Sequence, residues 1–157
     1  MAVATSIEIK NLFDKQAYDD IIQRINKLQP DSQRQWGKMN VAQMVTHLTR
    51  VFKVPLSDKQ IPRIFIGRLF GWAFKKQLYN EKPFKQGLPT ATSFKVTDER
   101  ELEKEKRMLL IVAEKFYRNG PEKASRFAHP LFGKFTGEQW GKALWKHVDH
   151  HLRQFNV

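Results

Sequence analysis

Apolar residues recur every three or four positions along most of the chain, and no segment alternates convincingly between apolar and polar residues. Spacing of three to four positions is typical of one face of an α-helix, whereas strict alternation is typical of a β-strand. The pattern therefore predicts an all-α protein. The expected helices are at about 12–28, from Asn40 onward, at about 63–78, from Thr97 or Asp98 onward, and at about 136–155.

Capping and breaking residues indicate where these helices begin and end. Asn40 and Gln43 match a capping box, in which two side chains bind the free backbone N–H groups of a helix start, and residues 136–139 repeat the pattern. The first helix should stop before Pro30, and the fourth at the Asn-Gly-Pro sequence of 119–121. Four long helices joined by loops of this length predict a four-helix bundle, with the third helix as an extra element or as one of the four.

Length and composition favour one packed domain, which we expect to cover residues 1–157. A hydrophobic fraction of 41% with 12 Phe and 4 Trp favours a folded chain, and the absence of cysteine excludes disulfides, iron–sulfur clusters and thiol nucleophiles. The N-terminus lacks the pattern of a signal peptide. The longest apolar run, 64–74, is too short to cross a bilayer of roughly 30 Å and contains an arginine. We therefore expect a cytoplasmic protein without a membrane partner.

The positive charge of the chain, +12 in total, is concentrated in its middle. Residues 61–97 contain seven Lys or Arg and one acid, Glu81, whereas residues 98–120 contain six of each. Basic proteins often bind polyanions, but no nucleic-acid-binding motif accompanies this segment. We interpret it as a solvated face or as the rim of a site for an anionic ligand.

Three of the five histidines lie within five residues near the end of the chain. On a helical projection His151 lies within the apolar face of the last helix and His147 at its edge, so this i, i+4 pair can converge on one point, whereas His150 projects away. His47 lies on the apolar face of the second helix. Because bundles build metal sites from inward side chains of packed helices, His47, His147 and His151 are candidate ligands of a divalent metal.

The alternative interpretation is that these histidines are hydrogen-bonded core residues. If they bind a metal, three neutral imidazoles suit Zn, Ni or Fe(II) and leave a position for water or substrate. His129 is interpreted as a residue that braces its loop, although it could also line a pocket.

Two stretches resemble a known superfamily: WGKMNVAQMVTHL at 36–48 and HPLFGKFTGEQWGKALWKHVDHHLRQF at 129–155. They are similar to the DinB/YfiT-like metalloenzymes, most closely to a bacterial subfamily of unknown function. The resemblance implies an up-down-down-up four-helix bundle and a divalent metal, usually Zn or Ni, on His47, His147 and His151. It also implies that dimers are common and that relatives include transferases and isomerases that use low-molecular-weight thiols, as well as metal-dependent hydrolases.

Three functions stay open at this point. The first is a metal-dependent enzyme acting on a small molecule. The H-E-x-x-H sequence of metalloproteases is absent and Asp149 faces away from the pair, so a low-molecular-weight thiol is a better expectation than a peptide. The second is a non-catalytic binding module for an anionic small molecule or nucleic acid that uses residues 61–97. The third is a protein that a metal stabilises without turnover.

Overall fold

The structure is a computed structural model and describes residues 6–157. Over these residues the chain forms five α-helices and two 3-10 helices and no β-strand, which confirms the predicted all-α class. The elements are α1 (Lys15–Asn26), α2 (Val41–Phe52), α3 (Phe65–Lys75), η1 (Lys76–Leu78), η2 (Thr92–Phe94), α4 (Leu102–Ala124) and α5 (Gly137–Gln154).

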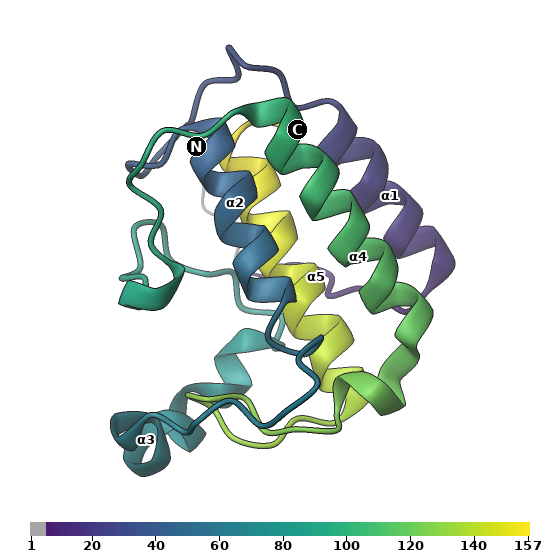
Figure 1. The fold of residues 1–157 in the computed structure, drawn as a ribbon, viewed down its shortest axis with the longest axis vertical. Helices are drawn as coiled ribbons and strands as arrows, with labels where there is room; N and C mark the ends of the chain where they lie inside the picture. The colour runs from purple at the N-terminus through teal and green to yellow at the C-terminus, as the bar shows by residue number, and fades with distance from the viewer. Residues whose placement is uncertain (1–5) are drawn as a thin grey trace.

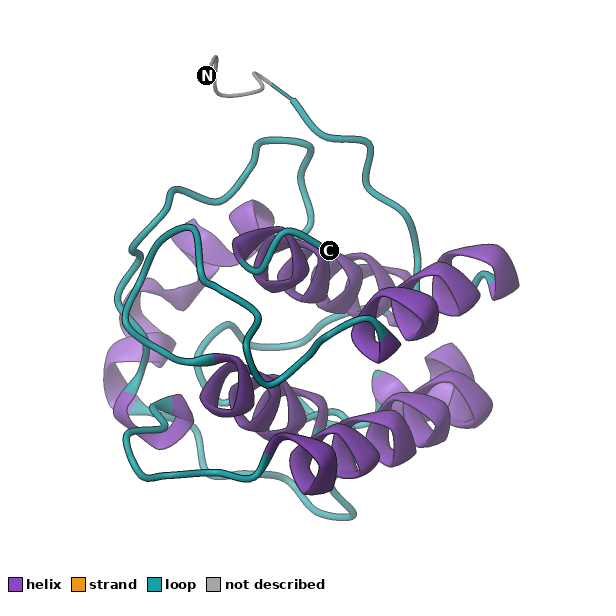
Figure 2. Cartoon of the chain, turned by 90° about the horizontal axis from the view of Figure 1, so that it is seen from above, coloured by secondary structure: helices purple, strands orange, loops and turns teal. Residues whose placement is uncertain are grey.

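Helices α1, α2, α4 and α5 lie side by side, whereas α3 projects from one end of the molecule (Figure 1). Seen from above, helices lie around a common interior (Figure 2). Helix α5 contacts each of the other three, and α4 also contacts α1 and α2. The core lies between these helices and contains the apolar faces expected from the sequence, including Ile21, Ile25, Met44, Leu48 and Leu144.

The two helices that carry the candidate ligands begin where the sequence predicts. In α2, Asn40 Oδ1 accepts a hydrogen bond from the Gln43 N–H at 2.9 Å, and Gln43 Oε1 accepts one from the Asn40 N–H at 3.0 Å. Thr136 and Gln139 close the start of α5 in the same way, at 3.1 Å in both directions. Both capping boxes are therefore confirmed.

Helix α4 begins later than predicted, at Leu102 instead of after Thr97 or Asp98. The Asp98 carbonyl accepts a hydrogen bond from the Gln43 side chain at 3.1 Å, and its carboxylate pairs with Arg100 at 2.6 Å. The hydrogen bond from Gln43 ties the segment before Leu102 to the start of α2, and the Asp98–Arg100 pair lies within that segment. Acidic residues favour a helix start, but here the first of them lie in the segment before the helix, and α4 begins only at Leu102.

Near the other end of α4, Gly120 interrupts the helix with φ 75° and ψ 175°. A positive φ is accessible to glycine at little cost, and Pro121 cannot donate a backbone hydrogen bond to the preceding turn. The predicted stop at the Asn-Gly-Pro sequence is therefore present as a kink. One further helical turn follows it and continues to Ala124.

Within residues 6–157, no helix is both long enough and apolar enough to cross a membrane.

Candidate metal centre

His47 from α2 meets His147 and His151 from α5. The three ring centroids are 5.1 Å (His47–His147), 4.9 Å (His47–His151) and 5.0 Å (His147–His151) apart. One ring nitrogen from each residue lies within 4.8 Å of the other two. The structure thus brings the three predicted residues into a nearly equilateral triangle around a common point.

Hydrogen bonds at the outer nitrogens orient two of these rings. His47 Nδ1 lies 3.0 Å from the Phe94 carbonyl oxygen of η2, and His151 Nδ1 lies 2.8 Å from Gln154 Oε1. Because a carbonyl oxygen accepts and never donates, each Nδ1 carries the proton and each Nε2 keeps a lone pair. Such outer hydrogen bonds are typical of metal-binding histidines, since they fix the tautomer and the ring orientation.

The inner nitrogens fit a divalent metal ion. His47 Nε2 lies 2.9 Å from His147 Nε2. Ligands of a tetrahedral site with metal–nitrogen distances of about 2.0–2.1 Å are roughly 3.3 Å apart, which is close to this distance. Three imidazoles are a donor set that Zn²⁺, Ni²⁺ and Fe²⁺ all accept. The cluster could therefore hold a metal ion.

Burial keeps these imidazoles neutral, which is the form that binds metal. It lowers the pKa of His47, and it lowers the pKa of His147 well below its usual value, with the neighbouring histidines adding to the effect. Burial, followed by the proximity of His47, lowers the pKa of His151 to about 3. His47 is buried, whereas His147 and His151 each keep a small exposed area.

The metal-free protein should lose stability as the pH falls below about 6.5. The unfolded chain binds protons at the ordinary histidine pKa of about 6.5, whereas the folded pKa of His151 is about 3, so protons favour unfolding between these values. The contribution is fully present above pH 6.5 and is lost as the pH falls toward 3, by up to about 1.4 kcal/mol per pH unit for each such histidine. Urea unfolding at several pH values measures this slope. The variant His151→Gln should have a smaller slope of the unfolding free energy against pH. An unchanged slope would contradict the lowered pKa of His151.

The remaining two histidines lie outside the cluster. His129 Nδ1 accepts hydrogen bonds from the backbone N–H groups of Leu131 at 3.0 Å and Phe132 at 3.3 Å, and burial lowers its pKa to about 4. His129 thus braces its loop. The His150 ring packs 5.5 Å from the Trp36 ring and 5.6 Å from the Phe84 ring, next to the cluster but not in it.

Two groups that support the cluster were not predicted. Gln154 accepts from His151 and also donates to the Trp36 carbonyl oxygen at 2.7 Å, so its orientation is fixed. Its position three residues after His151 is a helical-face signal that could have identified it. The Phe94 carbonyl belongs to a loop and has no comparable signal in the sequence.

Replacing Gln154 by leucine should weaken metal binding by about 10- to 100-fold, because His151 loses the acceptor that orients its ring. Gln154→Glu is the matched control, since a carboxylate still accepts from His151 Nδ1 and should retain most of the affinity. Competition with a chromophoric chelator measures both affinities. Equal losses in the two variants would mean that the hydrogen bond to His151 is not the cause.

Buried charges on α5 near the cluster are committed to other contacts. Asp149 pairs with Arg24 at 2.8 Å and with Arg153 at 2.9 Å. Lys146 Nζ donates to the Gln77 carbonyl at 2.6 Å and to the Asn80 carbonyl at 2.9 Å, and burial lowers its pKa to about 8. Among the residues that the structure describes, no carboxylate joins the three histidines.

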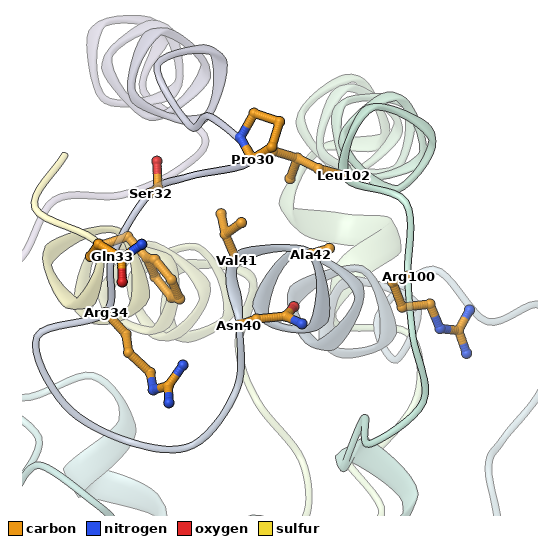
Figure 3. A pocket seen from close by; sticks show the side chains of 10 residues that line it. Pro30, Ser32, Gln33, Arg34, Asn40, Val41, Ala42, Arg100 and Leu102 are labelled. Carbon is orange, nitrogen blue, oxygen red and sulfur yellow. The ribbon is translucent and has the colours of Figure 1, made fainter.

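A separate cavity of about 250 Å³ lies at the N-terminal end of α2 (Figure 3). Its lining comes from the loop before α2, the first residues of α2, the start of α4 and the residue after α5. The lining residues are Pro30, Ser32, Gln33, Arg34, Asn40, Val41, Ala42, Arg100, Leu102 and Phe155. None of the three clustered histidines lines it, so the candidate metal centre is not part of this cavity.

A family model described as "Protein of unknown function (DUF1569)" matches residues 8–157, nearly the whole chain. The resemblance to the DinB/YfiT-like superfamily is therefore wrong as an assignment, because the family that the chain matches is DUF1569. No curated protein and no solved structure is significantly similar to the chain. The histidine cluster consequently has to be interpreted from its own geometry.

Proposed function

We propose that this chain, which belongs to the DUF1569 family of proteins of unknown function, binds one divalent transition-metal ion through His47, His147 and His151 and acts on a small-molecule substrate there. The observation that carries the proposal is the triangle of three imidazoles, with ring centroids 4.9 to 5.1 Å apart. Two of the rings donate their outer N–H groups to other acceptors, so their inner Nε2 atoms carry the lone pairs that would bind the ion.

Three histidine ligands would leave at least one coordination position of the ion open. A divalent ion held by three neutral imidazoles supplies Lewis acidity, which lowers the pKa of a water molecule or a thiol at its open position. His47 is buried and tied to the Phe94 carbonyl, so it holds a fixed position. His147 and His151 are less completely buried than His47, so a substrate would approach the ion from their side.

The surroundings of the cluster favour a thiol over water as the group that is activated. No carboxylate of the described residues joins the histidines, and both oxygens of Asp149 are paired with arginines, so no carboxylate is placed to act as a general base. A free thiol has a pKa of about 8.5 and water one of about 15.7, so a thiol needs less help to lose its proton. We therefore propose a low-molecular-weight thiol as the substrate class, with hydrolysis as the second candidate reaction.

The basic segment 61–97 is a suitable rim for an anionic substrate. The Phe84 ring lies 6.2 Å from the His147 ring, and Lys82 and Lys85 stand on either side of Phe84 in the sequence. Lys146 lies over the same ring, with its Nζ 4.3 Å from the ring centre. The charges of Lys82 and Lys85 would attract the carboxylates that cellular thiols carry.

The proposal includes a four-helix bundle as the scaffold, formed by α1, α2, α4 and α5 in up-down-down-up order within a single domain over 1–157. Its support is the set of contacts that α5 makes with the other three helices. In such bundles, metal sites are built from side chains on facing helices, as in the pairing of α2 with α5 here.

Elemental analysis of protein purified without a histidine tag or a metal resin tests the metal site. We expect about one Zn, Ni or Fe per chain, either as purified or after soaking of the metal-free protein. Co²⁺-loaded protein then tests the substrate class, because a thiol that reaches the ion adds an intense near-ultraviolet band. No metal after soaking would overturn the site, whereas bound Co²⁺ with a spectrum that thiols leave unchanged would overturn only the thiol.

A further inference from the structure

Helix α3 exposes most of its large apolar side chains. Trp72 is 75% exposed, Phe65 73% and Ile66 66%, and Leu69 and Phe70 are also at least half exposed. Among the named elements α3 contacts only η1, and it stands away from the four packed helices (Figure 1). So many exposed large apolar residues on one short helix indicate an interaction surface.

A glycine face explains why these side chains point outward. Gly67 and Gly71 are the buried residues of α3, and a Cβ atom on them would lie 2.5 Å and 1.9 Å from the Leu131 carbonyl oxygen. The helix therefore packs on the backbone at Leu131 through its glycine side. At 100° per residue, Phe65 and Trp72 then lie on the opposite side.

Further contacts hold α3 in this orientation. The Ile64 N–H donates to the Pro130 carbonyl at 3.0 Å, and Arg63 Nε donates to the same oxygen at 3.2 Å. At the other end of the helix, Lys75 Nζ donates to the Lys134 carbonyl. The apolar side is thus presented by a helix that is fixed at both ends.

The charges around this apolar side are positive. Arg68 and Lys75 lie on one flank of α3, between the glycine side and the apolar side, and Lys76 follows the helix directly. No acidic residue lies in α3, and residues 61–97 as a whole contain seven basic residues and one acidic residue. Large apolar and aromatic side chains next to basic ones are typical of helices that lie in a membrane interface.

We propose that α3 docks the protein on the surface of a bilayer that contains anionic lipids. Its 11 residues make a helix of roughly 16 Å, which can lie in the plane of the headgroups with Phe65, Ile66 and Trp72 inserted toward the acyl chains. The exposed Arg68 and Lys76 then face anionic headgroups. From the sequence alone we expected no membrane partner, but that expectation rested on the lack of a segment that could span a bilayer. A helix that lies on the bilayer surface needs no such segment.

The charge pattern disfavours a second copy of the chain as the partner. A two-fold dimer through α3 would bring the same surface of both copies together, and Arg68 and Lys76 of one copy would approach the positive face of the other. An anionic bilayer instead complements both the apolar and the charged residues. This proposal is independent of the histidine cluster.

Sedimentation with phosphatidylcholine vesicles, with and without phosphatidylserine, tests the proposal. The protein should sediment with the phosphatidylserine vesicles, less so at high salt, and only weakly with pure phosphatidylcholine. Trp72 is the strongly exposed tryptophan of the chain, so its fluorescence should shift to the blue on binding. Trp72→Phe should bind the same vesicles without this shift.

Two matched pairs of variants locate the surface. Phe65→Ser combined with Ile66→Ser should weaken vesicle binding by about tenfold or more, whereas Ile111→Ser, at a 58% exposed apolar position of α4, should leave it unchanged. Arg68→Gln should weaken binding by about fivefold, and the exposed Lys115→Gln should have no such effect. Circular dichroism confirms that each variant is folded.

Three outcomes would overturn the proposal. One is the absence of any preference for vesicles with phosphatidylserine. Another is equal vesicle binding by the α3 variants and their controls. The third is a dimer of the lipid-free protein that Phe65→Ser with Ile66→Ser dissociates, which would show that a second copy covers α3. The metal content of every variant should stay at the wild-type value, so failure here is separable from failure of the metal site.

Discussion

In the proposed metal site, replacing His151 by alanine should abolish metal binding and, with it, the rise in melting temperature that we expect from added Zn²⁺ or Ni²⁺. His151 supplies one of three nitrogens that lie within 4.8 Å of one another, and two imidazoles alone make a much weaker site. A ligand present at a hundred times its dissociation constant stabilises a protein by about 2.7 kcal/mol. The variant should lose most of this stabilisation by metal. Thermal unfolding with and without added metal, together with elemental analysis, measures both effects.

His150→Ala is the control for this result. His150 is adjacent in sequence and its ring lies 5.2 Å from the ring of His151, but it does not belong to the cluster. The control should keep its metal and its metal-dependent stabilisation. Metal retained by His151→Ala, or lost equally from both variants, would contradict the assignment of the ligands.

Replacing Asp149 by alanine should destabilise the protein strongly without removing the metal site. The Asp149 carboxylate is buried and pairs with Arg24 at 2.8 Å and with Arg153 at 2.9 Å, which ties α5 to α1. Removal of one partner of a buried ion pair leaves an uncompensated charge and typically costs about 3–5 kcal/mol. Arg153 is more than half exposed and can turn to water, so the lower part of that range is expected. Urea unfolding of the metal-free protein measures the loss.

Glu138→Ala is the comparison on the same helix. Glu138 pairs with Lys142 at 2.5 Å, but its side chain is largely exposed, so its loss should change the free energy of unfolding little. Folded Asp149→Ala protein should still bind one metal per chain. A small effect of Asp149→Ala, similar to that of Glu138→Ala, would mean that the pair with Arg24 does not stabilise the fold.

The helices and the histidine cluster could be predicted because local signals determine both. The Asn40 and Thr136 capping boxes fix where α2 and α5 begin, and helical periodicity then determines which side chains face the core. His47, His147 and His151 follow from that register. The prediction required only that α2 and α5 pack against each other, which they do.

Features that depend on tertiary contacts were not predictable. The segment before α4 is held by the hydrogen bond that the Gln43 side chain donates to the Asp98 carbonyl, and this bond joins residues 55 positions apart in sequence. The carbonyl that orients His47 lies in a loop at Phe94. The outward apolar side of α3 depends on Gly67 and Gly71 packing on the Leu131 backbone, whereas periodicity alone would place the large apolar residues inside.

The separation of the ligands along the chain has a consequence for how the protein unfolds. His47 and His147 are 100 residues apart, and the segment between them contains α3 and α4. An ion shared by these histidines would act as a reversible cross-link that closes a very long loop, and the ends of that loop could separate only after the ion had left. The rate of unfolding would then depend on the rate of metal release. Metal supply would thereby govern the lifetime of the folded protein as well as its chemistry.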